Sequence, residues 1–537
     1  MRAEAGPGLR PSAAFAAGVS AMLLATGVLG LATLVQPSVP FPPLGLAQRL
    51  LRLIPGRVDV FFIDLLGHWA LRLFAAGFAV GSILAGGAAG VLVARVSGPA
   101  QGGGSGARRT AAIWLAAAAL GVLAFGGWSA APGGPSLFTY ALLLGAAGAV
   151  FALALSGSLG RLERDVVPPP ASGLGRTRRE FLRAVVGAGG LVVVGLAVRR
   201  FSGGAIGGDH GGKPLARPAG AAPLKAATPP AASGGDRAFL SIPGLTPEVT
   251  PNKLHYVVDE SIIDPNIDSG SWRLRVDGLV GQPLTLTYQE LLALPAIEQY
   301  VTMQCISNLI GGDLVSTAKW TGVPLKALLA RAGGVKPGAV RVVFHAVGGY
   351  SDSLPVAKAL DGETVVAYGM NGQSLPRAHG YPARIIAPGI YGMKSVKWLQ
   401  RIEVVDYDYQ GYWQRGAGWD NIAVIKTASR IDVPHDLDSV RGEVMVAGLA
   451  WAGDRGISRV EVSFDGGATW TPAILRRELA KAAWRQWRLP WRPASAGKAV
   501  LKVRAVDGRG EAQTAAVAPP YPSGATGYQQ IQVITGS

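Results

Sequence analysis

The residue with the clearest chemical potential is Cys305, the single cysteine among 537 residues. It lies in the segment Val301-Thr-Met-Gln-Cys-Ile-Ser-Asn308. One cysteine excludes an intramolecular disulfide, a Cys-x-x-Cys redox pair, an iron–sulfur cluster and a c-type haem attachment. A single thiolate suits one coordination position on a transition metal whose other ligands come from a cofactor. The alternative is a buried free cysteine that packs as a small apolar side chain.

Two other stretches carry polar residues at short spacing. The first, Thr250-Pro-Asn-Lys-Leu-His-Tyr-Val-Val-Asp259, precedes the cysteine segment, and the second runs from Met370 through His379 and Arg384 to Trp398. An arginine can bind an anion through two charge-assisted hydrogen bonds from its planar guanidinium. Taken singly, His379 is equally explained as a turn histidine, and Arg384 as the partner of a surface carboxylate.

In order and spacing, these three stretches resemble the sulfite oxidase family of molybdenum-cofactor oxidoreductases, and more narrowly its bacterial membrane-attached, haem-free members. The resemblance covers roughly residues 240 to 535. It implies a molybdenum–molybdopterin cofactor and an enzyme that transfers an oxo group together with two electrons. No haem or iron–sulfur cluster is expected in this chain.

The resemblance also implies roles for particular residues. Cys305 would be the thiolate ligand of molybdenum and thereby the catalytic residue. Backbone amides in the turn-rich run after Gly392, together with Lys397, would close around the cofactor like other anion-binding nests. Asn308 is interpreted as organising the loop after Cys305. The residues expected to bind the cofactor are Asn252, His255, Tyr256, Cys305, His379, Arg384, Ser395, Val396 and Lys397.

The sequence departs from the sulfite oxidase pattern at two places near the substrate. An arginine that follows the aromatic residue of the first stretch is missing, because Tyr256 is followed by Val257 and Val258. An active-site tyrosine after a Trp-Gln pair is also missing, since Trp413-Gln414 is followed by Gly416-Ala-Gly-Trp419 in that region. Loss of a cation and a phenol from an anion pocket weakens the expectation that sulfite is the substrate.

Three functions therefore stay open. The first is two-electron oxo transfer on a small oxyanion or S-oxide, as in sulfite oxidases. The second is reduction of an S-oxide of the methionine sulfoxide type. The third is a cofactor-free, membrane-tethered binding protein that retains the fold.

The first two hundred residues are apolar and rich in glycine. Five segments approach the length of roughly 20 residues that crosses a bilayer. Arginines crowd the loop before the fifth segment and precede the first, which predicts a cytoplasmic N-terminus and a multi-pass cell-membrane protein with its catalytic domain on the extracytoplasmic face. The predicted spans are residues 13–34, 69–93, 110–128, 137–159 and 184–198.

The run Thr177-Arg-Arg-Glu-Phe-Leu-Arg183 stands directly before the fifth apolar segment. It has the form of a twin-arginine export signal, although it is internal. The alternative is an ordinary cytoplasmic arginine cluster. Twin-arginine export carries proteins that are already folded, which suits a protein whose cofactor is inserted in the cytoplasm.

The predicted organisation has four parts. A multi-span α-helical membrane region (1–201) is followed by a flexible Gly/Ala/Pro-rich linker (202–237). An α+β, sulfite-oxidase-like molybdopterin-binding domain (238–433) comes next, in which Thr287 caps a helix at Tyr288–Ala293. Short alternating strands separated by turns then predict an all-β, immunoglobulin-like sandwich of the dimerisation type (434–537).

Within the α+β domain, Ser271–Val276 is expected to be a strand that ends at the turn signal Asp277-Gly278. Residues 323–332 are expected to form a short helix.

The formal net charge of +17 does not indicate nucleic-acid binding, because tracts of lysine and arginine interleaved with aromatics are missing. The expected partners are a small-molecule substrate, the membrane and a separate redox partner, which would be a haem or quinone protein or a soluble carrier. A homodimer is a further possibility raised by the terminal domain.

Overall fold

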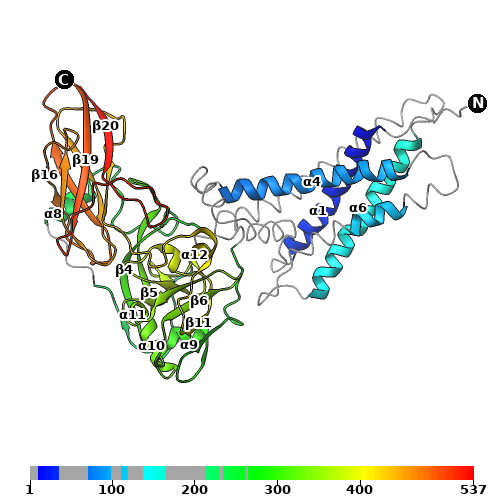
Figure 1. Ribbon diagram of the computed structural model, residues 1–537, viewed down its shortest axis with the longest axis horizontal. Helices are drawn as coiled ribbons and strands as arrows, with labels where there is room; N and C mark the ends of the chain where they lie inside the picture. Colours follow the sequence, from blue (N-terminus) through cyan, green and yellow to red (C-terminus); the bar gives the residue numbers. More distant parts are fainter. Residues whose placement is uncertain are drawn as a thin grey trace, which may run out of the picture. The chain divides into compact units, whose positions relative to one another are not determined.

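The structure is a computed structural model that describes residues 10–35, 70–97, 110–118, 137–164, 212–228, 234–259 and 264–536. Contacts divide the chain into two units (Figure 1). The first comprises residues 1–208 with 261–266, and the second comprises residues 209–260 with 267–537.

The first unit contains three long helices, α1 (Pro11–Val35), α4 (Ala70–Ser97) and α6 (Leu137–Arg164). Helix α1 packs closely on α4, since a Cβ added to Gly18 would lie 2.1 Å from the Gly86 carbonyl oxygen. Small residues allow such close approach of apolar helices. Within the described ranges, one helix is long and apolar enough to cross a membrane, over Pro11–Leu29. The multi-span region therefore stays a prediction, and its fifth segment and the Arg178-Arg179 pair lie outside the described residues.

Two mixed sheets form the α+β domain of the second unit. The first sheet has the order β1 (Leu224–Lys225), β4 (Ala296–Gln304), β5 (Val315–Pro324), β8 (Val365–Met370) and β10 (Arg384–Ile386), with β9 (Gln373–Ser374) paired to β8. The second has the order β3 (Leu284–Thr287), β2 (Arg273–Gly278), β11 (Leu399–Val405), β6 (Arg341–Ala346) and β7 (Ser351–Pro355). Val276 and Phe344 of the second sheet share one core with Val366 and Ile385 of the first, which makes this a single domain.

Short helices connect these strands. They are α8 (Gly234–Leu240), α9 (Tyr288–Ala293), α10 (Leu325–Arg331), α11 (Val356–Ala359), α12 (Tyr412–Ala417) and the 3-10 turns η3 (Arg377–His379) and η4 (Gly392–Lys394). The capping box predicted at Thr287 is confirmed, because its side chain accepts from the Glu290 N–H while Glu290 accepts from the Thr287 N–H. The helix predicted at 323–332 is α10.

Strand β2 extends further than its sequence indicates. Gly278 has the positive φ of 80° expected at a turn, but Asp277 belongs to the strand and is buried. Asp277 accepts from Arg401 Nε at 2.9 Å, so it is an ion-pair residue as well as part of a turn signal.

The predicted flexible linker (202–237) is wrong where the structure describes it. Strand β1 pairs in parallel with the edge of β4, with Leu224 opposite Ala296. Arg217 donates to the carbonyl oxygens of Leu292 (3.1 Å) and Leu294 (2.7 Å). These bonds satisfy carbonyls that the end of α9 leaves without helical partners, which explains why residues 212–228 belong to the α+β domain.

The last part of the chain is a β-sandwich, as predicted. One sheet has the order β12 (Ala428–Val433), β14 (Val444–Trp451), β18 (Arg485–Trp491) and β17 (Ile474–Leu475). The other has the order β13 (Ser439–Arg441), β20 (Gln529–Gly536), β19 (Gly497–Asp507), β15 (Ile457–Ser463) and β16 (Thr471–Pro472); β19 and β20 lie side by side in Figure 1. The sandwich begins at residue 428, six residues before the predicted boundary at 434.

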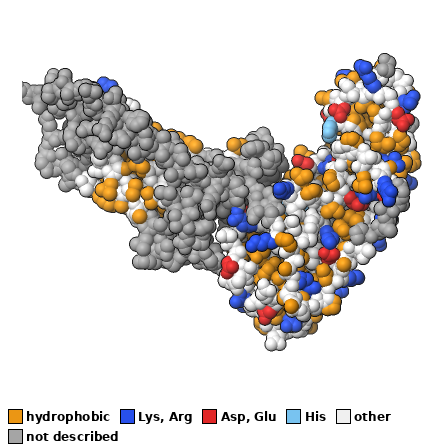
Figure 2. Space-filling model, turned by 180° about the vertical axis from the view of Figure 1, so that it is seen from behind, with side chains coloured by type: hydrophobic (Ala, Val, Ile, Leu, Met, Phe, Trp, Pro, Cys, Tyr) orange, Lys and Arg blue, Asp and Glu red, His pale blue; other side chains and the backbone are white. Residues whose placement is uncertain are grey.

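The surface of the second unit carries charges of both signs. On the face drawn in Figure 2, Lys and Arg side chains are interspersed with Asp and Glu and with apolar residues. This face therefore lacks the extended single-sign field that a polyanion-binding surface requires.

Candidate functional site

Strand β4 ends at Gln304 and thereby delivers Cys305 to a buried position. The Cys305 N–H donates to the Leu314 carbonyl oxygen (2.9 Å), and Asn308 Oδ1 accepts from the Leu314 N–H (2.9 Å). Asn308 therefore closes the loop after Cys305, which confirms its predicted role. Ser307 Oγ lies 3.0 Å from the sulfur.

Burial raises the pKa of the Cys305 thiol, and hydrogen bonds from Ser307 oppose this rise. A neutral thiol is thus favoured while only protein surrounds the sulfur. A bound metal cation reverses that preference, because coordination deprotonates a thiol.

The sandwich holds the strand that carries the cysteine. Trp451 Nε1 donates to Gln304 Oε1 (2.9 Å), and the Trp484 N–H donates to Thr302 Oγ1 (2.6 Å). The terminal domain therefore fixes the end of β4 directly.

The predicted residues of the Thr250–Asp259 stretch and of the Met370–Trp398 stretch meet at His379 in η3. His379 Nε2–H donates to the Asn252 carbonyl oxygen (3.0 Å), and the ring centroids of His255 and His379 are 5.1 Å apart. The Asn252 side chain is held by Gln373 (2.9 Å) and Asn371 (2.8 Å). Two segments that are more than a hundred residues apart in the chain thus form one wall of the site.

Arg384, the first residue of β10, is buried without an acidic partner. Its NH1 and NH2 groups donate to the carbonyl oxygens of His379 (3.1 Å) and Ser395 (2.9 Å). Its guanidinium lies 5.2 Å from the centroid of the Trp320 ring. Burial lowers the pKa of Arg384 to about 10, and no Asp or Glu in the described ranges pairs with it. The alternative interpretation, in which Arg384 pairs with a surface carboxylate, is therefore wrong.

The run from Ser395 to Lys397 lies beside Arg384. Ser395 Oγ accepts from the Ala387 N–H (3.4 Å), and the Ile385 N–H donates to the Val396 carbonyl oxygen (2.9 Å). The Val396 side chain packs in the core, which leaves only its backbone to contact a cofactor. Lys397 Nζ pairs with Asp259 and donates to the Ala378 carbonyl oxygen (3.0 Å).

Tyr256 connects this wall to the cysteine. A Cβ added to Gly392 would lie 2.5 Å from the Tyr256 hydroxyl and 3.3 Å from the Gln304 carbonyl oxygen. Only a glycine at 392 leaves room for that hydroxyl beside the end of β4. Burial raises the pKa of Tyr256 well above its ordinary value, the Cys305 thiolate adds to the rise, and Arg384 opposes it.

These residues fit a cofactor that bears an anionic phosphate and a metal. The Arg384 charge is buried and uncompensated, which is costly unless an anion binds. The indole N–H of Trp320, fully buried beside that guanidinium, has no hydrogen-bond partner in the described part of the chain. No cluster of three or more His, Cys, Asp or Glu ligands occurs among the described residues, so Cys305 would act as a single protein ligand.

Sequence reasoning missed Trp320, Asn371 and Lys394. Asn371 stands inside the recognised stretch from Met370 to Trp398, but neither it nor Trp320 was assigned a role, because both contact segments that are distant in the chain. Lys394 stands inside the same stretch, between Gly392 and Ser395. The sequence pattern does not predict that its side chain is buried beside Asp352.

Comparison with known proteins agrees with this donor set. Residues 261–413 match the family described as oxidoreductase molybdopterin binding domain, and residues 420–518 match the Mo-co oxidoreductase dimerisation domain. Fold and site together define a molybdopterin-dependent oxidoreductase.

The chain is also similar to named sulfite oxidases. It is 33% identical over 319 residues to sulfite oxidase of Gallus gallus, covering 50% of this chain and 69% of that protein. It is 34% identical over 319 residues to mitochondrial sulfite oxidase of Homo sapiens, covering 50% of this chain and 58% of that protein. The chain belongs to the sulfite oxidase family.

Among solved structures, the sulfane dehydrogenase SoxCD from Paracoccus pantotrophus matches with a TM-score of 0.47 and 26% identity, covering 53% of this chain and 81% of that chain. The chain spans 58% of the length of the mammalian sulfite oxidases it matches, and the matched half leaves the N-terminal helices unaccounted for.

Proposed function

We propose that this chain catalyses two-electron oxo transfer on a small oxyanion or S-oxide, with a molybdenum–molybdopterin cofactor ligated by Cys305. The observation that carries the proposal is the convergence of the buried Cys305 with Tyr256 at one end of the site and of the uncompensated Arg384 with His379 at the other. When bound, the cofactor would supply a metal that exchanges an oxygen atom together with two electrons.

The protein's own residues would bind and orient. The Cys305 sulfur provides one ligand, and the loop closed by Asn308 fixes its direction. Arg384 and Lys397 would neutralise the phosphate, Arg384 through its fork and Lys397 as a point charge. His379 would hold the pterin against the wall formed with Asn252.

Replacement of the expected cation favours S-oxide reduction as a second candidate. Val257 and Val258 stand where sulfite oxidases carry an arginine, and a neutral S-oxide does not need that positive charge. Reduction of an S-oxide would consume electrons from a partner, whereas oxidation of an oxyanion would deliver them.

One experiment decides among these functions. The purified protein, from cells able to make the cofactor, is analysed for molybdenum and pterin and assayed with artificial electron carriers against sulfur oxyanions and S-oxides. We expect about one molybdenum and one pterin per chain and turnover on one substrate class. A protein without either component would refute the enzyme and favour a tethered binding protein.

We further propose that the N-terminal helices anchor the catalytic domain to the cell membrane and that this domain works on the extracytoplasmic face. The apolar helix over Pro11–Leu29 and the arginine distribution support this topology. The dimerisation domain favours a homodimer, and electrons would pass to or from a separate redox partner. Protease added to intact spheroplasts should release the catalytic domain; full protection would refute the orientation.

A further inference from the structure

The α+β domain contains an ion pair that the proposed chemistry does not use. Lys394 Nζ lies 2.7 Å from Asp352 Oδ1, and both side chains are 0% exposed. Burial raises the pKa of Asp352, and the Lys394 charge opposes that rise. Such a pair is weak evidence for stability, because removing two charges from water costs as much as their attraction returns. The pair is therefore better explained by a geometric role than by a contribution to stability.

Lys394 is fully satisfied in this position. Besides Asp352, its ammonium donates to the Ser353 carbonyl oxygen (3.1 Å) and to Asn421 Oδ1 (3.3 Å). These are three acceptors for three N–H groups. The side chain is thus held from three directions and has no alternative orientation of equal energy.

Asp352 is equally confined. Its Oδ1 accepts from the Ser353 N–H (2.7 Å), and Oδ2 accepts from Gln414 Nε2 (3.5 Å). A Cβ added to Gly411 would lie 2.6 Å from the Asp352 carboxyl carbon. The pair therefore connects β7, which carries Asp352, with η4 and α12.

The turn η4 stands between the two ends of the cofactor site. On one side, Gly392 packs beside the Tyr256 hydroxyl and the end of β4, next to the predicted metal ligand. On the other, the Ser395 carbonyl oxygen accepts from Arg384 at 2.9 Å. Any displacement of Lys394 moves both contacts, because Ser395 directly follows it and only Met393 separates it from Gly392.

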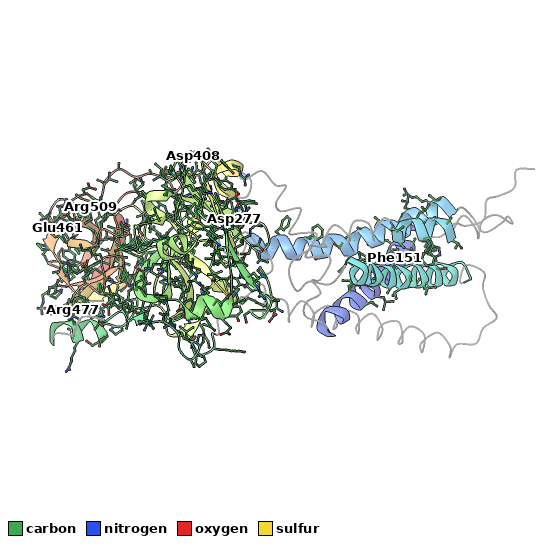
Figure 3. All side chains as sticks on the ribbon, turned by 90° about the horizontal axis from the view of Figure 1, so that it is seen from below. Phe151, Asp277, Asp408, Glu461, Arg477 and Arg509 are labelled. Atoms are coloured by element: carbon green, nitrogen blue, oxygen red, sulfur yellow. The ribbon has the colours of Figure 1, made fainter. Side chains whose placement is uncertain are left out.

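A second bond supports the same turn from the residue directly before β7. Tyr350 Oη donates to the Met393 carbonyl oxygen at 2.7 Å. The network also reaches solvent, since Asn421 Nδ2 donates to Asp408 Oδ1 (3.3 Å) and the Asp408 side chain is 61% exposed. Asp408 lies at the surface of the domain in Figure 3.

We propose that the Lys394–Asp352 pair is a positioning device that sets the spacing between the thiolate end and the phosphate end of the cofactor site. Both residues act by positioning the turn and would not touch the cofactor. The inference rests on the proposed function, because it requires a cofactor in this site. The pair fixes the turn before the cofactor arrives, so it acts in the cofactor-free protein as well.

The test is the double variant Lys394→Met/Asp352→Leu, which removes both charges without leaving one unpaired in the core. We expect a folded protein whose pterin and molybdenum content falls about 10-fold, the size of effect seen when outer partners of metal ligands are removed. Hydrogen exchange of the amides of residues 391–397 should accelerate in the cofactor-free variant. The matched control is Arg401→Met/Asp277→Leu, which removes an ion pair on the second sheet, away from the turn.

Lys394→Arg provides the second variant if the double variant does not fold. It keeps the charge but replaces a point charge by a planar fork, so we expect a folded protein with altered absorption of the thiolate–metal centre and reduced cofactor content.

The inference would be overturned if the double variant kept the cofactor content, the spectrum and the amide exchange of the wild type. If the double variant does not fold, a Lys394→Arg variant with the spectrum and the cofactor content of the wild type would overturn it. Wild-type protein without molybdenum or pterin would instead refute the proposed function.

Discussion

At the scale of single residues, Cys305 combines low exposure with a raised thiol pKa. Free protein thus keeps the sulfur protonated, and a metal is needed to hold the thiolate. Changing Cys305→Ser should lower oxo-transfer activity at least about 100-fold, since a neutral hydroxyl is a poor replacement for a thiolate ligand. Thermal unfolding should stay close to wild type, and Ser307→Ala, which keeps the thiol, is the control. Undiminished turnover of the serine variant would refute the assigned role.

Arg384 shows why two cations in one site are not equivalent. Its guanidinium donates to three backbone carbonyl oxygens and, among the described residues, still has two N–H groups free to donate, whereas a lysine has no planar fork. Arg384→Lys should therefore fold but retain about 10-fold less pterin. The measurement is pterin fluorescence after release from purified protein, with the exposed Arg273→Lys as control. Equal retention in both variants would contradict phosphate binding by Arg384.

Lys397 offers a test by pH. Burial lowers the pKa of its ammonium to about 7, so in the wild type Lys397 loses its charge as the pH rises through about 7. In Asp259→Asn the charged ammonium also loses its ion-pair partner, which lowers its pKa further. Cofactor retention should therefore fall between pH 6 and pH 8.5 in the wild type and at lower pH in the variant, measured by pterin loss on dialysis. Parallel pH profiles would show that Lys397 does not meet the phosphate as a cation.

At the scale of elements, strand β1 and Arg217 make residues 212–228 part of the catalytic domain. A soluble chain that begins at residue 212 should be more stable than one that begins at 234, by at least about 2 kcal/mol, because each lost hydrogen bond contributes about 1 kcal/mol net. Urea unfolding of the two chains measures the difference. Equal free energies of unfolding would restore the linker interpretation for this segment.

Local patterns predicted those elements whose cause is local. The capping box at Thr287 and the strand predicted at Ser271–Val276 depend on neighbours within a few residues, and the structure confirms both. The docking of residues 212–228 and the Lys394–Asp352 pair were not predictable in this way. Their partners are separated by 42 residues or more, so the contact exists only once two sheets have packed.

The same reasoning explains the candidate site. The motifs identified Cys305, His379 and Arg384 by residue type, because the chemistry restricts which side chains serve. Supporting residues such as Trp320 cannot be identified by residue type, because many different side chains can fill a packing position. Residues named from motifs therefore lie at the centre of the site, and those that position them were found only from contacts.

At the scale of the whole molecule, three parts of the chain contribute to one site. The sandwich holds β4 through Trp451 and Trp484, and the segment before β2 supplies Asn252 and Tyr256. A site assembled from such distant segments requires the entire second unit to fold before the cofactor can be retained. This dependence supports the proposal that the domain is exported in the folded state, with the cofactor already bound.

The Arg178-Arg179 pair tests that conclusion. Changing both residues to lysine preserves the positive charge. If charge alone sets the orientation of the helices in the membrane, the orientation of the variant should therefore be that of the wild type. A twin-arginine pathway reads the arginines themselves, and we expect the catalytic domain of the double variant to stay in the cytoplasm, protected from protease in spheroplasts. The matched control is Arg161→Lys/Arg164→Lys at the C-terminal end of α6, which should leave accessibility as in the wild type. If the domain of the Arg178/Arg179 variant is cleaved as readily as that of the control, charge alone directs the topology and the export signal is refuted.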